Sequence, residues 1–251
     1  MEKLSKNLIK SDDSTKSVRL NKYISDAGFC SRREADRLIE SGKVTVDDYM
    51  AVMGQKVLPG QVVKVNDKVI NVNDELILIA YNKPLGIECT TDKGNPDNIV
   101  DCINYPSRIY PIGRLDKNSQ GLILLTNTGE LVNKILKSSN FHEKEYVVKV
   151  DKPITSEFIK EMEDGVIIEL EDGKRKVKTR KCTVKQIDKF TFSIILTQGL
   201  NRQIRRMCRA LKYNVMALER IRIMNIELGN LPLGHYRNVS KSEIIKLTQE
   251  Q

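Results

Sequence analysis

The chain has 251 residues, which is long enough to bury a core and to form one large domain, or a small domain beside a larger one. Hydrophobic residues make up 40% of the sequence, and no apolar run approaches the roughly 18 residues that a membrane-spanning helix needs. Lysine and arginine (42) outnumber aspartate and glutamate (33), so the formal net charge is +9. These features exclude an integral membrane protein and favour a polyanion such as nucleic acid as partner.

Residues 1–16 are polar and of mixed charge, and they lack the apolar segment of a signal peptide. We therefore expect a flexible tail on a cytoplasmic protein. The five cysteines form no C-x-x-C pair, and their number is odd, which indicates reduced thiols. The two histidines, His142 and His235, are far apart, so we expect no metal site. No glycine-rich phosphate loop occurs, and we expect no cofactor.

Residues 17–75 are predicted to form a small separate unit. Apolar spacing indicates a helix over residues 18–27, which Gly28 ends. Ser31 and Glu34 have the spacing of a capping box, and a second helix should follow and end at Gly42. Short strands are expected over residues 43–46 and 57–65. The second helix carries Arg32, Arg33 and Arg37, which form either a solvated face or a phosphate-binding face.

The stretches over residues 19–36 and 39–44 resemble the small RNA-binding module named after ribosomal protein S4. This resemblance favours RNA contact for the three arginines of the second helix. Residues 76–245 should form a second domain, in which strands outnumber helices and no regular βαβ repeat occurs. We predict an α+β fold, with a mixed and mainly antiparallel sheet. The expected helices are residues 129–137, 153–162 and 201–211; the expected strands are 76–80, 121–127, 145–150, 177–185, 190–197 and 215–226.

A polar loop with a single acid precedes the strand at residue 121. In Gly113-Arg-Leu-Asp116, the carboxylate of Asp116 is flanked by Arg114 and Lys117, and neighbouring cations keep a carboxylate charged, as a nucleophile requires. On local chemistry alone, an acid that only caps or pairs within a turn is the simpler interpretation. Similarly, Tyr146 in the segment His142–Val148 could be an ordinary core residue with its hydroxyl at an edge.

Residues 201–225 form a basic window that carries most of the excess charge, with seven lysines and arginines against Glu219 alone. Arg202, Arg205, Arg206 and Arg209 would span one broad face of the helix expected at residues 201–211. This face could be merely solvated. However, four arginines in eight residues repel one another unless an anion lies nearby.

The stretch from Tyr110 to Gly129, which contains Gly-Arg-Leu-Asp116 followed by Ser119-Gln-Gly-Leu, resembles the signature of the RsuA/RluB/RluE/RluF branch of pseudouridine synthases. The resemblance implies that Asp116 attacks the ribose or the base of a target uridine. It also implies that Tyr146, in a K-x-Y motif, stacks on the base and is a candidate proton acceptor. Arg205, in R-Q-I-R, would pair with Asp116, and Leu200 would line the base pocket.

Arg114, Arg202, Arg206 and Arg209 would then contact RNA, together with the arginines of the S4-like module. Residues 95–101, 104–108 and 219–225 look most like the RluF type, which implies 23S rRNA or a large-subunit assembly intermediate as partner. The family uses neither metal nor cofactor. Residues 169–176 depart from the pattern of the family, and we expect them to form a surface hairpin. We expect a monomer, because no interface stripe is visible.

Two other functions remain open at this stage. A non-catalytic RNA-binding or ribosome-assembly protein would explain the charge and the S4-like module equally well. An Asp-dependent nucleic-acid hydrolase would usually need several metal-binding carboxylates, whereas Asp116 stands alone in its motif. The combination of Asp116, Tyr146 and Arg205 favours the synthase.

Overall fold

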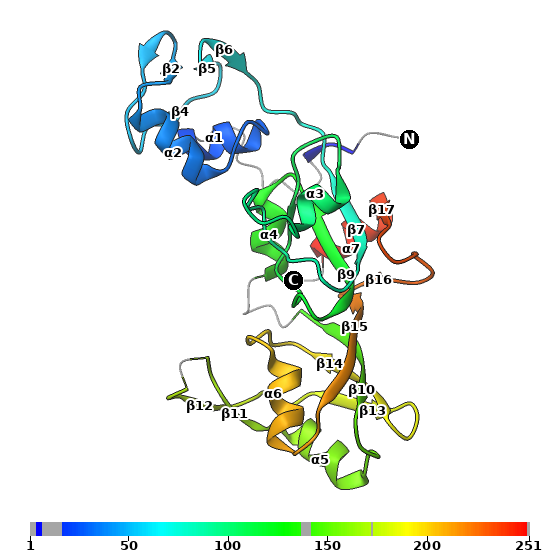
Figure 1. The fold of residues 1–251 in the computed structure, drawn as a ribbon. Coiled ribbons are helices and arrows are strands. Elements are labelled where there is room, and N and C mark those ends of the chain that lie inside the picture. Colours follow the sequence, from blue (N-terminus) through cyan, green and yellow to red (C-terminus); the bar gives the residue numbers. More distant parts are fainter. Residues whose placement is uncertain (1–3, 7–16, 137–141, 172, 250–251) are drawn as a thin grey trace. The chain divides into compact units, whose positions relative to one another are not determined.

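The computed structural model describes residues 4–6, 17–136, 142–171 and 173–249 (Figure 1). Most of the tail expected over residues 1–16 lies outside these ranges. The chain divides into two compact units. The first comprises residues 1–77, 105–109 and 126–131, and the second comprises residues 78–104, 110–125 and 132–251.

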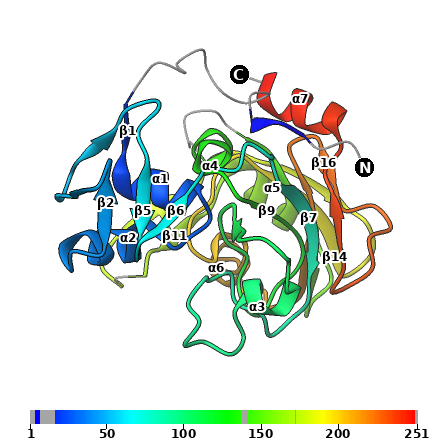
Figure 2. The ribbon, with the colours of Figure 1, turned by 90° about the horizontal axis from the view of Figure 1, so that it is seen from above.

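The first unit packs two short helices against small antiparallel sheets (Figure 2). The helices are α1 (Leu20–Asp26) and α2 (Arg32–Glu40). The four-stranded sheet has the order β3-β2-β5-β6, and β1 pairs with β4. These strands are β1 (Val18–Arg19), β2 (Val44–Val46), β3 (Tyr49–Met50), β4 (Lys56–Val57), β5 (Val63–Val65) and β6 (Lys68–Ile70). Leu20, Ile24, Ala35 and Ile39 from the helices join the buried valines of β2 and β5 in one core.

Three local expectations for this unit need correction. The first helix begins at Leu20, because Val18 and Arg19 pair with β4 instead. The strand expected over residues 57–65 is two strands, which are separated by a turn with Gly60 at φ +88°. Ser31 does cap α2, since its Oγ accepts from the Glu34 amide at 3.2 Å. The Glu34 carboxylate, however, accepts from Arg37 Nη1 at 3.1 Å, so the capping box is only half formed.

The second unit is built on a nine-stranded sheet with the order β13-β14-β10-β15-β9-β7-β17, to which β16 and β8 add at β15 and β9. Antiparallel pairs are β13 with β14, β14 with β10, β10 with β15, β15 with β16, and β7 with β17, whereas β15 and β9 pair in parallel. The predicted fold class is confirmed. The strands are β7 (Leu78–Lys83), β8 (Tyr110–Pro111), β9 (Gln120–Thr126), β10 (Lys144–Val150), β13 (Thr183–Gln186), β14 (Thr191–Leu196), β15 (Val215–Ile223), β16 (Ile226–Glu227) and β17 (Tyr236–Asn238).

The remaining helices are α3 (Ile99–Ile103), α4 (Gly129–Leu136), α5 (Ser156–Asp164), α6 (Gln203–Ala210) and α7 (Lys241–Gln249). The first three residues of α4 belong to the first unit. A separate hairpin joins β11 (Ile167–Glu169) to β12 (Lys176–Lys178), as expected for the region around residues 169–176, of which residue 172 is not described. The strand expected over residues 177–185 is therefore divided between β12 and β13. The domain boundary expected at residue 245 falls inside α7, and helices α3 and α7 were not expected.

Helix α6 is positioned by its apolar face. Ile204, Met207 and Cys208 are buried at helical spacing, and they pack with Phe192 of β14 and Leu218 of β15 in one core cluster. Its arginines are left on the other side. Arg202 is not part of this helical face, because it adopts a left-handed conformation with φ +50° immediately before the helix. The single broad arginine face expected over positions 202–209 is therefore limited to three residues.

Candidate active site

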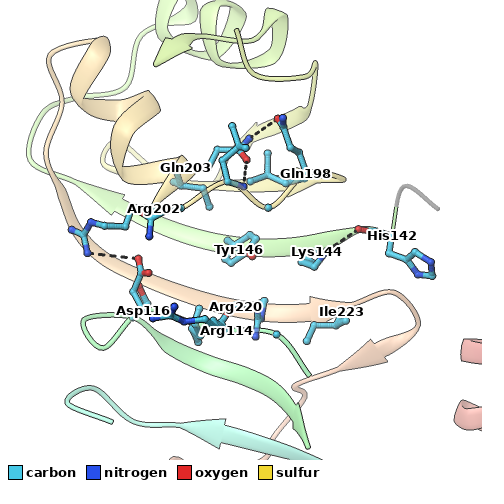
Figure 3. A pocket seen from close by; sticks show the side chains of 18 of the residues that line it. Arg114, Asp116, His142, Lys144, Tyr146, Gln198, Arg202, Gln203, Arg220 and Ile223 are labelled. Carbon is cyan, nitrogen blue, oxygen red and sulfur yellow. Dashed lines mark hydrogen bonds and ion pairs between the residues drawn. The ribbon is translucent and has the colours of Figure 1, made fainter. Parts of the chain in front are cut away.

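A cleft of about 710 Å³ opens in the second unit. Its walls come from the loop over residues 112–119, strands β10 and β15, and the loop over residues 197–202 that leads into α6. Figure 3 shows Asp116 and Arg202 pointing toward one another at one side of it, and Tyr146 and Lys144 along β10. The residues expected to act in catalysis, Asp116, Tyr146 and Arg205, all line this cleft.

Asp116 lies in the loop that connects β8 to β9. The loop is fixed at several points: the Leu115 amide contacts Cys89 Sγ at 3.3 Å, and the Gly86 amide donates to the Lys117 carbonyl at 2.9 Å. The Asp116 side chain is 33% exposed. Its Oδ2 lies 3.7 Å from Arg202 Nη1 and 4.0 Å from Arg205 Nε. Two guanidinium groups therefore flank a carboxylate that solvent and substrate can reach.

Arg205 connects α6 to this loop. Its Nη2 donates to the Asn118 carbonyl at 2.5 Å and to Ser119 Oγ at 3.2 Å, and its Nη1 donates to the Val215 carbonyl at 3.3 Å. The side chain is only 15% exposed. Burial and the neighbouring Arg202 lower the pKa of Arg205, while Asp116 opposes that shift. The contacts hold the guanidinium in one orientation beside Asp116.

Tyr146 lies in the middle of β10, directly opposite Ile194 of β14 and Arg220 of β15. Its ring is partly buried against the core, and it lines the cleft. The guanidinium carbon of Arg220 lies 6.0 Å from the centre of this ring. The cleft thus offers an aromatic surface beside an acid–arginine group.

The other predicted residues lie in different surroundings. Arg114, Arg202 and Leu200 line the cleft. Leu218 of β15, which was not predicted, lines it as well. Arg206 is engaged within the protein, because its guanidinium donates to the Glu169 carbonyl and, at 3.1 Å, to Asn201 Oδ1. This position ties α6 to the β11–β12 hairpin. Arg209 is exposed on α6 and is not among the residues that line the cleft.

Arg32, Arg33 and Arg37 belong to the first unit. All three are exposed on α2, and none of them is among the residues that line the cleft. Arg37 donates to Glu34 at 3.1 Å. These arginines are available to a polyanion, whereas Arg205 and Arg206 are largely committed to contacts within the protein.

Buried cations near the cleft were not predicted. Arg220 is 3% exposed and Lys83 is fully buried. Lys83 Nζ donates to the carbonyls of Pro84 and Ile87, each at 2.8 Å, and burial lowers its pKa. Burial and the charge of Arg220 lower the pKa of Lys144 as well. No sequence signal marks these cations as buried, because their surroundings depend on strand pairing.

A second missed feature was visible in the sequence. Six of the eight residues over 174–181 are lysine or arginine, with no acid among them, which is denser than the window around α6. All six side chains are exposed on or beside β12, and Arg180 also lines the cleft. The six are Lys174, Arg175, Lys176, Lys178, Arg180 and Lys181.

Among the described residues, no three His, Cys, Asp or Glu side chains gather as they would around a metal ion. Nor is any helix within the described ranges long and apolar enough to cross a membrane.

Comparison with known proteins agrees with this geometry. Residues 77–210 match the family of RNA pseudouridylate synthases, and residues 18–69 match the S4 domain. The chain is 56% identical over 233 residues to the dual-specificity RNA pseudouridine synthase RluF of Escherichia coli K12, covering 92% of this chain and 78% of that protein. It is 36% identical over 234 residues to ribosomal large subunit pseudouridine synthase B of Bacillus subtilis 168, covering 91% and 95%.

A solved structure described as a pseudouridylate synthase superposes with a TM-score of 0.67 at 26% identity, over 92% of this chain and all of that one. The resemblance found in the motifs around Asp116 is therefore confirmed, as are the fold class and the enzyme class. The chain belongs to the RNA pseudouridylate synthase family and carries an S4 domain before its synthase domain.

Proposed function

We propose that this enzyme converts uridine to pseudouridine in large-subunit ribosomal RNA, with Asp116 as nucleophile. The observation that carries the proposal is the position of Asp116, between Arg202 and Arg205 at the side of a cleft that Tyr146 also lines. The relatives support the substrate, because one is named for the ribosomal large subunit and another is named as an RNA pseudouridine synthase. Binding alone would need no exposed acid among arginines.

The reaction exchanges one glycosidic bond for another. The bond from ribose C1′ to uracil N1 breaks, the base turns, and a bond forms from C1′ to C5; the hydrogen on C5 is lost and N1 gains one. Asp116 attacks the target nucleotide, while Arg205 holds the carboxylate in position through its bonds to the Asn118 carbonyl and Ser119. Tyr146 stacks on the base and accepts the proton, with Leu200 and Leu218 as apolar walls.

The target base must leave its stack to enter the cleft, which costs a few kcal/mol. Contacts to the RNA backbone offset this cost. The exposed arginines of α2 and the basic residues over 174–181 are the surfaces with the charge for such contacts. Loops and single strands are the expected substrates, because their bases splay out more easily than paired ones.

The test uses ribosomal RNA from cells that lack this gene. Pseudouridine is mapped after incubation with the wild-type protein or with Asp116→Ala, and RNA binding by each protein is measured in parallel. We expect modification at one or a few positions of the large-subunit RNA by the wild type alone, with equal binding by both. Activity on transfer RNA only would overturn the ribosomal substrate. Activity in Asp116→Ala would overturn the role of Asp116.

A further inference from the structure

Arg220 lies on β15, a central strand of the sheet, and lines the cleft. On β15 it lies directly between Tyr146 of β10 and Gly121 of β9. Gly121 permits this close approach, because a Cβ there would lie 2.4 Å from the Arg220 carbonyl oxygen and its φ is +104°. The position of Arg220 therefore depends on three strands at once: β15 itself, β10, which carries Tyr146, and β9, which follows the loop that holds Asp116.

The guanidinium of Arg220 has only part of its hydrogen-bonding capacity used. Its Nε donates to the Leu122 carbonyl at 2.7 Å, and its Nη1 donates to the Arg114 carbonyl at 3.3 Å, in the loop that holds Asp116. Its Nη2 is buried and has no hydrogen-bond partner among the described residues. A buried donor without an acceptor costs folding free energy, and protein structures hold few of them.

Within the part of the chain that the structure describes, Arg220 also has no acidic side chain paired with it. Arg222, two residues along the same strand, donates to Glu145 at 2.9 Å and to Glu143 at 3.0 Å. The charges that face Arg220 include Lys83 and Lys144, and the repulsion contributes to the lowered pKa of each. Two arginines on one strand thus differ in kind: Arg222 is neutralised within the protein, whereas Arg220 has a spare donor and an uncompensated charge.

A molecule bound in the cleft could supply the acceptor that Arg220 Nη2 lacks. Arg220 is among the residues that line it, and its guanidinium carbon lies 6.0 Å from the centre of the Tyr146 ring. A base stacked on Tyr146 would bring its edge to this guanidinium. Uracil has carbonyl oxygens at positions 2 and 4, both of which accept hydrogen bonds, whereas cytosine has an amino group at position 4.

We propose that Arg220 recognises the flipped uracil, with Nη2 donating a hydrogen bond to one of its two carbonyl oxygens. This inference rests on the proposed stacking of the base on Tyr146. A donor fixed in a buried site selects strongly for an acceptor, because a substrate without that acceptor leaves the donor unsatisfied. The same guanidinium holds the Arg114 carbonyl, so it fixes the base and the Asp116 loop in one frame.

The test exchanges oxygen for sulfur on the substrate, because sulfur is a weaker hydrogen-bond acceptor. RNA oligonucleotides carry uridine, 2-thiouridine or 4-thiouridine at the position that the wild-type enzyme modifies, and single-turnover rates are measured for wild type, Arg220→Lys and Arg220→Met. We expect one thio substitution to slow the wild type roughly 10- to 100-fold, the effect of losing a hydrogen bond to a charged group. The same substitution should have no effect on Arg220→Met.

Position 2 or 4 is identified by which substitution shows this interaction. Arg222→Met is the matched control: it loses two ion pairs on the same strand, and both thio effects should keep their wild-type size in it. Arg220→Lys keeps the charge but lacks Nη2, so it should behave as Arg220→Met does toward the thio substrates. Thermal unfolding of each variant separates a loss of fold from a loss of recognition.

Two results would overturn the inference alone. One is a wild-type enzyme that is insensitive to both thio substitutions. The other is a thio substitution that slows the Arg220 variants by the same factor as it slows the wild type, because independent effects multiply. Wild-type inactivity on every ribosomal uridine is a different failure, because it overturns the proposed substrate and this inference with it. If neither Arg220 variant folds, the wild-type thio series still decides whether the base carbonyls are recognised.

Discussion

Two short helices of this chain carry clustered arginines, and their surroundings differ. On α2, Arg32, Arg33 and Arg37 are exposed to solvent. On α6, Arg205 donates to three acceptors and lies beside Asp116, and Arg206 donates to the Glu169 carbonyl. Similar charge density therefore serves two purposes: α2 presents charge outward, and α6 uses it to hold the parts of a cleft together. A high density of arginines predicts that an anion lies nearby. Burial distinguishes the two cases, because exposed arginines can meet an external polyanion, whereas the buried Arg205 meets Asp116 within the protein.

The sharpest way to break this comparison is within α6, where Arg205 and Arg209 lie one helical turn apart. Arg205→Lys keeps the charge but loses the planar group that contacts Asn118, Ser119 and Val215. We expect the single-turnover rate to fall by roughly 10²- to 10³-fold, the range found when one oriented donor is lost from an active site, with RNA affinity within about threefold of wild type.

Arg209→Lys is the control, since Arg209 is exposed and lies outside the cleft lining. Its rate and its affinity should both stay within about twofold of wild type, as for most surface substitutions. Equal loss of rate in the two variants would show that the orientation of Arg205 beside Asp116 has no special role in the reaction.

The complementary test removes the arginines of α2. Replacing Arg32, Arg33 and Arg37 with alanine should weaken RNA binding by roughly tenfold and reduce the slope of log K against log salt by about 2, since each contact with a single strand contributes about 0.7. The rate at saturating RNA should not change. Filter binding from low to moderate salt and single-turnover kinetics measure the two quantities.

The matched control for α2 removes three exposed lysines from the same unit, namely Lys43, Lys56 and Lys68. Net charge changes equally in both triple variants. If the lysine variant loses the same affinity and the same salt slope, the unit binds RNA only through its total charge. If the arginine variant loses rate at saturation instead of affinity, α2 does not act as an exposed binding surface.

Local signals explain which parts of the fold could be predicted. Helix α2 was found because Ser31 and Glu34 mark its start. Helix α7 was missed although Ser240 and Glu243 carry the same spacing, and there the box is complete: Ser240 Oγ accepts from the Glu243 amide at 3.3 Å, and the Glu243 carboxylate accepts from the Ser240 amide at 2.8 Å. The strands expected at 57–65 and 177–185 were wrong because apolar alternation does not show where a chain turns.

The residues of the site also divide into those that a local motif marks and those whose place depends on the fold. Asp116, Tyr146 and Arg205 could be chosen because each lies in a motif that a family resemblance marks. Leu218 and Arg220 could not, because their place in the cleft depends on the pairing of β15 with β9 and β10, which are distant in sequence. The engagement of Arg206 by the Glu169 carbonyl depends on the fold of the β11–β12 hairpin. Residues of this kind are found only when strand register is known.

The smallest expected effect concerns Arg237, which is not among the residues that line the cleft. Arg237 Nη2 and Nη1 donate to the two carboxylate oxygens of Glu243 at 2.8 and 3.0 Å. Burial alone would raise the pKa of Glu243, but the hydrogen bonds from Arg237 and Ser240 outweigh it and lower the pKa to about 2, from an ordinary value of 4.5. Because the folded state holds the charged form, this stabilisation is present above pH 4.5 and is lost as the pH falls toward 2.

Glu243→Gln should therefore unfold more easily than wild type at pH 7, by about 1–2 kcal/mol once solvent screening of this partly exposed pair is allowed for. Urea unfolding at pH 7, 5 and 3.5 measures the difference, which should be unchanged between the first two and smaller at the third. Glu227→Gln, at an exposed position of β16, is the control and should show little difference at any pH. The opposite outcome is a difference in the free energy of unfolding that is as large at pH 3.5 as at pH 7. Arg237 would then stabilise α7 through packing and hydrogen-bond geometry, and its charge would contribute nothing, unlike the charges of α2 and α6.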